Sequence, residues 1–189
     1  AGHIGQGCAL LAVQHHQPLQ HQLAQDAQGR AGGMALRAQL RQARRALDAP
    51  TRLAAAETLA GQLLQLPFAP ARGLVAGYWA GDGEIALHRW QTQLPPGVTY
   101  CLPLLAGDSL RFAPWHPGQA LTHNRYGIPE PDIALADALP AQAMALVVTP
   151  LLVFDRHCQR LGMGGGWYDR SFAFRLQHAA PPWLPPQNP

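Results

Sequence analysis

The sequence predicts an α/β fold, and three segments lead to this prediction. Residues 145–154 are almost unbroken apolar and β-branched, which is typical of a strand buried on both faces. A glycine-dense loop follows. After it, residues 167–176 contain no Gly or Pro and place Tyr168, Phe172 and Leu176 on one helical face. We therefore expect a strand, a loop and a helix in this order at the end of the domain.

The first part of the domain is expected to be helical. In residues 34–47 an apolar stripe has helical spacing and comprises Leu36, Leu40, Ala43 and Leu47. We expect the arginines to lie on the opposite side of this helix, and Arg41, Arg44 and Arg45 to form a solvated basic face. A second helix should begin near Asp48 and run to about residue 66, with a buried stripe of Leu53, Ala56, Leu59, Leu63 and Leu66.

The middle of the chain predicts strands. Residues 73–79 form a short strand, 80–83 a turn, and 84–90 resume helical spacing. Residues 98–105 and 110–115 are two further strands with a short gap, which indicates a hairpin. Residues 126–131 contain two prolines, so we expect a rigid turn rather than a strand.

Composition limits the class of protein. The chain has 189 residues, 48% of them hydrophobic, which suits one domain with a sizeable core, and its formal net charge is only +3. The arginines lack interleaved aromatics, and Cys8, Cys101 and Cys158 lack paired or metal-ligand spacing. No apolar run has the length of a membrane span, and the start has no signal-peptide pattern. We expect a cytoplasmic monomer that binds neither nucleic acid nor membranes.

Three segments differ in composition. Residues 1–33 are rich in Gln and His, and we expect a flexible extension there; metal binding by this tract is the alternative. Residues 34–176 should form a single α/β domain. Residues 177–189 are too rich in proline to continue a helix or a strand, so we expect an irregular tail.

The glycine-dense loop has a chemical use. Glycines at positions 162, 164, 165 and 166 allow backbone conformations closed to other residues and let a ligand approach the main chain. The loop amides and the first N–H groups of the next helix suit a phosphate. Arg160 would add a forked donor, and Asp169 could hold Mg²⁺ beside the phosphate. The alternative is an ordinary tight turn, and neither standard nucleotide-binding fingerprint fits.

These residues also carry a resemblance. Phe154-Asp155, Arg160-Leu161-Gly162, Gly164-Gly165-Gly166 and Tyr168-Asp169-Arg170 resemble the C-terminal signature of the 5-formyltetrahydrofolate cyclo-ligase family, also called methenyltetrahydrofolate synthetases. The resemblance covers about residues 34–176. It implies a three-layer α/β/α open sheet of Rossmann-like type, and the segments 98–105, 110–115 and 127–131 are similar to the family too.

The resemblance also implies an activity. The family cyclises 5-formyltetrahydrofolate to 5,10-methenyltetrahydrofolate with ATP and Mg²⁺, releasing ADP and phosphate. By resemblance, Trp79 and Glu84 contact the folate and Asp169 is the magnesium ligand. The implied ATP-binding residues are Arg37, Arg160, Leu161, Gly162, Met163, Gly164, Gly165, Gly166, Trp167 and Tyr168.

The sequence departs from the family at several positions. Gly33 stands where the family has Lys, and Met163 and Gly165 occupy positions that are often basic. After Leu176 the family has another strand pair, so we expect a sheet that lacks its last strand or strands. Weaker phosphate neutralisation follows.

Two other classes of function stay open. One is a catalytically impaired homologue that binds folate or nucleotide. The other is a sugar-phosphate isomerase or CoA-transferase-like enzyme on a related sheet. Serine hydrolysis is disfavoured because no Gly-x-Ser-x-Gly elbow occurs in the chain. Zinc chemistry is disfavoured because the histidines of the expected domain are not paired at ligand spacing.

Overall fold

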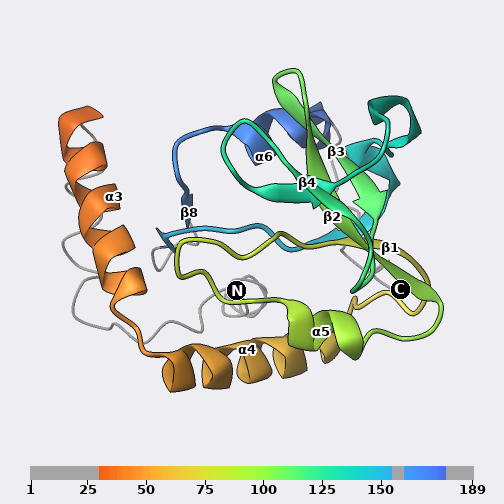
Figure 1. Ribbon diagram of the computed structural model, residues 1–189, viewed down its shortest axis with the longest axis horizontal. Helices are drawn as coiled ribbons and strands as arrows, with labels where there is room; N and C mark the ends of the chain where they lie inside the picture. The colour runs from red at the N-terminus through yellow and green to blue at the C-terminus, as the bar shows by residue number, and fades with distance from the viewer. Residues whose placement is uncertain (1–29, 155–159, 178–189) are drawn as a thin grey trace, which may run out of the picture. The chain divides into compact units, whose positions relative to one another are not determined.

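The computed structural model describes residues 30–154 and 160–177 (Figure 1). The expected extension up to residue 29 and the tail from residue 178 lie outside the described residues, as do positions 155–159 of the glycine-dense loop. The chain divides into two compact units, and each is described by itself. The first contains the described part of Ala1–Leu63 with Ala80–Thr92 and Pro150–Gly165. The second contains Leu64–Trp79, Gln93–Thr149 and the described residues from Gly166 on.

A four-stranded mixed sheet organises the second unit. Its strands are β1 (Gly73–Ala76), β2 (Val98–Ala106), β3 (Ser109–Pro114) and β6 (Met144–Val147), in the order β3-β2-β1-β6. β1 runs parallel to β2 and to β6, whereas β2 and β3 are antiparallel. The predicted hairpin is confirmed, because Ala106 pairs with Ser109 across a two-residue connection.

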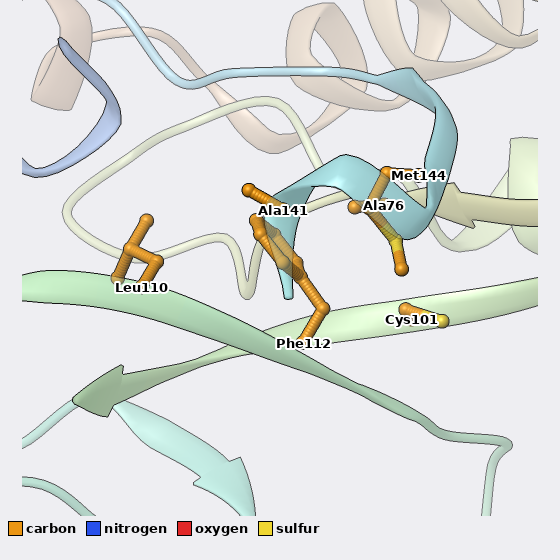
Figure 2. Packing of buried hydrophobic residues seen from close by; sticks show 6 residues of the cluster. All are labelled: Ala76, Cys101, Leu110, Phe112, Ala141 and Met144. Carbon is orange, nitrogen blue, oxygen red and sulfur yellow. The ribbon is translucent and has the colours of Figure 1, made fainter. Parts of the chain in front are cut away.

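The larger core cluster of this unit lies on one face of that sheet. Six buried residues form the cluster: Ala76, Cys101, Leu110, Phe112, Ala141 and Met144 (Figure 2). Phe112 is 0% exposed, and it is among the largest fully buried side chains of the described chain. Burial also raises the pKa of the Cys101 thiol to about 12, so this group packs as a small apolar side chain. Burial of these apolar groups is what stabilises the unit.

The last helix is shorter than predicted. α6 (Trp167–Ser171) is docked on β3, because the Leu110 amide donates to Ser171 Oγ at 2.7 Å. The chain then becomes a 3-10 helix, η3 (Ala173–Gln177). Phe172 and Phe174 both pack against the core cluster. Residues two apart lie on opposite sides of an α-helix, so these two contacts require the chain to leave α-helical geometry.

The predicted strand 145–154 is wrong in its extent. β6 ends at Val147, and among the described strands it lies at an edge of the sheet with Ala145 exposed. Pro150 lacks an N–H and disfavours continued pairing around it. The chain then enters a separate two-stranded sheet of the first unit, made by β7 (Val153–Phe154) and β8 (Arg160–Leu161).

The proline-rich segment forms a short strand, which the sequence did not predict. β5 (Pro129–Pro131) pairs antiparallel with β4 (Leu121–His123). The fixed φ of proline suits extended backbone, and a two-stranded ribbon leaves an open side where no N–H is needed. Glu130 accepts hydrogen bonds from the Leu105 amide at 3.2 Å and from Asn124 Nδ2 at 3.1 Å. Two 3-10 turns, η1 (Leu135–Asp137) and η2 (Ala141–Ala143), lead on to β6.

Two helices begin the described chain, α3 (Arg30–Arg45) and α4 (Ala49–Leu64). Asp48 caps α4, since its Oδ1 accepts the Thr51 amide at 2.7 Å. Hydrogen bonds from Thr51 hold the pKa of Asp48 below its usual value. The predicted stripe on α4 is confirmed at Ala56, Leu59 and Leu63, but Leu53 is 67% exposed.

Two predictions about the first unit are wrong. On α3 the buried face includes Leu36 and Arg44, whereas Ala43 is exposed. The helix expected at 84–90 begins only at His88 in α5 (His88–Thr92). Ile85 and Leu87 are buried and Ala86 between them is exposed, which is the alternation of extended chain. None of the helices in the described parts of the chain has the length and hydropathy that a bilayer crossing requires.

Replacing Phe112 tests the importance of the core cluster. We expect Phe112→Ala to lower the free energy of unfolding by about 3–5 kcal/mol, because a fully buried ring is replaced by a cavity. Phe68, which is 37% exposed, is the matched control, and Phe68→Ala should cost less than about 1 kcal/mol. Urea denaturation of both variants measures this, and equal losses would contradict the packing described.

Candidate functional site

The glycine-dense loop leaves β8 and is open to solvent. Met163 is 49% exposed, and Gly164 and Gly165 are also exposed. Gly164 has φ +91° and Gly166 has φ +65°, so these two positions need glycine for conformational reasons. A Cβ on Gly162 would meet nothing within 4 Å and the position lacks a left-handed φ. A ligand can therefore approach the main chain at Gly162 closely.

Arg37 reaches this loop from α3. Its Nε donates to the Gly162 carbonyl at 3.0 Å, and its guanidinium carbon is 3.7 Å from the position of a Cβ on Gly164. Its Nη1 donates to the Gly33 carbonyl at 3.1 Å. A guanidinium carries five N–H groups, so N–H donors of Arg37 remain beyond these two bonds. The sequence-predicted residues Arg37, Gly162 and Gly164 are thus brought together within the first unit.

Gly33 accommodates the bent side chain of Arg37. A Cβ at position 33 would lie 3.2 Å from Arg37 Nη1, which is closer than an ordinary contact. The absence of a side chain there lets the guanidinium fold back onto the helix. A side chain at position 33 would therefore require Arg37 Nη1 to move.

Arg160 and Leu161 form the strand that leads into the loop. Their backbones pair with β7, with Phe154 opposite Arg160 and Val153 opposite Leu161. Leu161 is half-buried. The side chain of Arg160 lies outside the described residues, so its predicted role as a forked donor stays a prediction.

In the second unit, Trp167 is already covered by cations. Arg125 and Arg170 place their guanidinium carbons 5.3 Å and 5.1 Å from the centre of its indole ring. The ring of Tyr126 meets it edge-on at 6.0 Å. Arg170 Nε also donates to the Asp108 carbonyl at 2.6 Å, which connects α6 to the β2–β3 turn. The indole is therefore a packing group in this arrangement.

Tyr168 and Asp169 point to different surroundings. Tyr168 stacks on Phe172 with ring centres 6.5 Å apart and packs against the core cluster. Asp169 is exposed in the first turn of α6. The Arg170 amide donates to the Gly166 carbonyl at 3.0 Å, which closes the first turn of α6.

A metal ion would have few protein ligands here. The described residues contain no group of three or more His, Cys, Asp or Glu side chains that could hold one. Mg²⁺ usually takes one or two carboxylates and fills its shell with water and phosphate oxygens. One exposed carboxylate at Asp169 fits that mode when a nucleotide supplies the remaining oxygens.

Trp79 follows β1 and is 37% exposed. Its ring meets Trp115 edge-on, with centres 5.6 Å apart and planes at 83°. The ring is thus packed against Trp115, while part of it faces solvent. The predicted folate contact stays a prediction.

Glu84 closes a tight turn instead of opening a helix. Its amide donates to the Gly81 carbonyl at 2.9 Å, and its Oε2 accepts the Gly81 amide at 3.1 Å. Asp82 has φ 54°, and it is the only non-glycine residue in the described ranges with a positive φ. Gly83 follows with φ +79°, and a Cβ there would be 3.2 Å from the Arg44 carbonyl. The turn is thus pressed against the C-terminal end of α3.

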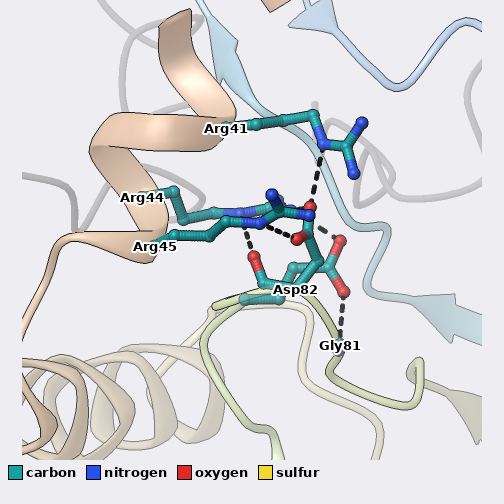
Figure 3. A network of polar contacts seen from close by, with 6 residues as sticks. Arg41, Arg44, Arg45, Gly81 and Asp82 are labelled. Carbon is teal, nitrogen blue, oxygen red and sulfur yellow. Dashed lines mark hydrogen bonds and ion pairs between the residues drawn. The ribbon is translucent and has the colours of Figure 1, made fainter. Parts of the chain in front are cut away.

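Three arginines of α3 surround this turn, which the sequence did not predict. Arg41 Nε and Arg44 Nη2 each lie 2.9 Å from Asp82 Oδ2, and Arg45 Nε bonds to Oδ1 (Figure 3). The expected solvated basic face is wrong most clearly at Arg44, whose side chain is only 3% exposed. A buried cation requires anionic partners, and Asp82 supplies one.

Arg44 also reaches Glu84. Its Nη1 lies 3.4 Å from Glu84 Oε1, and its Nε donates to the Asp82 carbonyl at 3.0 Å. Burial raises the pKa of Glu84, although the Gly81 amide and Arg44 act in the opposite direction. The pKa of Asp82 shifts in the other direction. Burial alone would raise it, but the hydrogen bonds from Arg41 and Arg45 together outweigh burial and lower it.

A signal for this cluster was present in the sequence. Arg37, Arg41 and Arg44 are spaced by four and three residues, so they share one helical face with each other. Leu36 and Leu40 lie beside them on the same face. Arginines next to an apolar stripe can be buried where an acid is available, and the sequence has Asp82 in the predicted turn 80–83 and Glu84 directly after it.

Known proteins resemble this chain over most of its length. The sequence model of the 5-formyltetrahydrofolate cyclo-ligase family matches residues 30–183. The 5-formyltetrahydrofolate cyclo-ligase of Escherichia coli (strain K12) is 35% identical over 136 residues, which is 70% of this chain and 75% of that protein. That of Mycolicibacterium smegmatis is 33% identical over 156 residues, covering 77% of this chain and 75% of the relative.

Solved structures agree with this relationship. The NMR structure of Aquifex aeolicus 5,10-methenyltetrahydrofolate synthetase superimposes with a TM-score of 0.64 at 25% identity, over 75% of this chain and 72% of that one. A Mycoplasma pneumoniae 5,10-methenyltetrahydrofolate synthetase shares the fold, with a TM-score of 0.54 at 18% identity over 83% and 81% of the two chains. The α/β fold class predicted from the sequence is confirmed. The chain belongs to the 5-formyltetrahydrofolate cyclo-ligase family, a family of enzymes.

Proposed function

We propose that this protein converts 5-formyltetrahydrofolate to 5,10-methenyltetrahydrofolate and couples the ring closure to hydrolysis of ATP to ADP and phosphate. Family membership supports the substrate class. The observation that carries the ATP part of the proposal is the exposed glycine-dense loop with the Arg37 guanidinium bonded to the Gly162 carbonyl and packed on Gly164.

The chemistry explains why ATP is needed. The formyl oxygen on N5 is a poor leaving group, and transfer of the γ-phosphoryl of ATP to that oxygen makes it a good one. N10 then attacks the formyl carbon and loses its proton, and the C–O bond breaks with release of phosphate. Such a reaction needs positioning and charge neutralisation more than a protein nucleophile.

The loop would bind the triphosphate. The half-buried Gly162 and the exposed residues 163–165 offer backbone that phosphate oxygens can approach, and Arg37 has N–H donors beyond its two carbonyl bonds. Arg160, Leu161, Met163 and Gly166 lie beside these residues in the chain. Because α6 has only five residues, its dipole adds little, and Trp167 and Tyr168 would contribute backbone amides rather than their rings.

We assign Asp169 as the protein ligand of Mg²⁺. Its exposed carboxylate follows the last loop glycine, Gly166, by three residues in the chain, and a nucleotide bound to the loop would supply phosphate oxygens to the same ion. When bound, Mg²⁺ neutralises charge on the transferring phosphate. The role of the chain is to hold one carboxylate at this point and to leave the rest of the coordination shell open.

Glu84 and Trp79 are proposed to contact the folate. The Glu84 carboxylate has about four acceptor positions and uses two of them on Gly81 and Arg44, so it can accept further N–H groups from a pterin. The partly exposed ring of Trp79 offers apolar surface for an aromatic ligand.

A direct turnover assay tests this function. Purified protein with ATP, Mg²⁺ and 5-formyltetrahydrofolate should give a growing methenyltetrahydrofolate absorbance, and omission of Mg²⁺ or ATP should abolish it. ADP should form in equal amount to the methenyl product. Binding of both ligands without any product would instead identify an impaired homologue that only binds them.

The substitution Gly162→Ala tests the loop. The protein itself should tolerate the new methyl group, because no atom lies within 4 Å of it and the backbone is not left-handed. We expect the KM for ATP to rise about tenfold, because the methyl group would hold phosphate off the backbone, while the KM for folate changes less than about twofold.

The control for this substitution is Gly61→Ala. Gly61 lies in α4 and also has no atom within 4 Å of an added Cβ, so this variant should leave both KM values unchanged. An unchanged KM for ATP in Gly162→Ala, at an unchanged melting temperature, would show that the nucleotide does not approach the main chain at this point.

A further inference from the structure

We infer that Arg44 is a positioning residue for the folate-binding carboxylate of Glu84, and that Asp82 serves to hold Arg44 in that role. This inference rests on the proposed function, in which Glu84 contacts the folate. It assigns a task to a buried arginine that touches neither of the proposed substrates in that proposal. All the groups involved belong to the first unit.

The position of Arg44 differs from that of its neighbours on α3. Its side chain is 3% exposed, whereas the side chains of Arg41 and Arg45 are 40% and 57% exposed. Arg44 also reaches Glu84, because its Nη1 lies 3.4 Å from Glu84 Oε1. A cation this deeply buried without a structural partner would be costly, so its contacts are specific rather than incidental.

Each of the three nitrogens of the Arg44 guanidinium contacts a different oxygen atom. Nε bonds to the Asp82 carbonyl at 3.0 Å, Nη2 to Asp82 Oδ2 at 2.9 Å, and Nη1 faces Glu84 Oε1. Because the group is planar, the two contacts to Asp82 fix the direction in which Nη1 points. The orientation of one side of Glu84 is thus set by Asp82 through Arg44.

The backbone of the turn is shaped to allow this. Asp82 takes a left-handed φ of 54°, which presents its carbonyl and its carboxylate to the same arginine. Gly83 then passes so close to α3 that a Cβ would lie 3.2 Å from the Arg44 carbonyl. Strained backbone of this kind persists where surrounding contacts demand it, and it is concentrated at functional sites.

The second oxygen of Glu84 is held separately. Oε2 accepts the Gly81 amide at 3.1 Å, so each carboxylate oxygen has one partner and a remaining acceptor position. The charged groups that face Glu84 are Arg44 from α3 and Asp82 from its own turn. Arg44 favours the ionised carboxylate, which is the form that can accept N–H groups from a pterin.

The test is a binding cycle that needs no turnover. The dissociation constant of 5-formyltetrahydrofolate, measured by titration calorimetry without ATP at pH 7.5, is compared among Glu84→Gln, Arg44→Gln and the double variant. We expect about a tenfold weaker affinity for each single variant. The double variant should be within about twofold of Glu84→Gln, because Arg44 acts through the carboxylate that has been removed.

Three further variants serve as controls. Arg45→Gln removes another arginine from the same Asp82 carboxylate without touching Glu84, and it should change the affinity less than about twofold. Arg44→Lys should recover part of the affinity, since it keeps the charge but loses the fork. Asp82→Asn keeps the shape of the original side chain and weakens its contact with Arg44. It therefore tests the same positioning of Glu84 if Arg44→Gln does not fold.

The pH dependence separates positioning from mere structural support. Binding should weaken as pH falls through the raised pKa of Glu84, because the protonated acid loses acceptor capacity. Removing the positive charge in Arg44→Gln should raise the pKa of Glu84 further. The loss of binding on the acid side of the pH profile, the acid limb, should then occur at higher pH. Removing the negative charge in Asp82→Asn should move it to lower pH, since Asp82 disfavours ionisation of Glu84.

The outcomes are distinguishable. If Arg44→Gln weakens binding by the same factor with and without Glu84, or if neither variant moves the acid limb, the inference is wrong while the folate contact stands. If Glu84→Gln leaves the affinity unchanged, the assignment of Glu84 in the proposed function is wrong and the inference falls with it.

Discussion

Burial of the Arg44 guanidinium is the constraint on which the arrangement of the first unit depends. A cation that is 3% exposed cannot be left unpaired, so the chain must bring acids to the end of α3. The turn at residues 81–84 does this with a left-handed Asp82, a glycine pressed on the helix and the Glu84 carboxylate. Glu84 in the same turn is the residue that we propose to contact the folate. The contacts that stabilise the unit therefore also position a substrate-binding group.

Much of the fold could be predicted from local patterns. The β2–β3 hairpin and the buried stripe of α4 follow from apolar spacing and a short polar gap. The errors arise where tertiary contacts override a pattern. The apolar run at 145–154 is divided at Pro150, and α6 ends early because Phe172 and Phe174 both pack on the core. The apolar spacing within one segment does not show which contacts that segment will make with the rest of the chain.

The residues of the candidate site could be predicted from the sequence, but their contacts with one another could not. The glycine-dense loop and its resemblance to a family singled out Gly162, Gly164 and Arg37, which lie together in the first unit. The sequence could not show that Arg37 donates hydrogen bonds to two backbone carbonyls. It also could not show that Arg125 and Arg170 lie over the ring of Trp167. The arginines of α3 were misassigned because a solvated face is the usual fate of such charges.

If Arg44 holds the turn of Asp82 against α3, the two side chains should be coupled energetically, and a double-mutant cycle on stability measures this coupling. The free energy of unfolding is measured by urea titration for Arg44→Gln, Asp82→Asn and the pair, with Arg45→Gln in place of Arg44→Gln as the matched cycle. We predict a coupling energy of about 2 kcal/mol or more for the buried Arg44 pair and below about 1 kcal/mol for the exposed Arg45 pair. Equal coupling energies in the two cycles would contradict it.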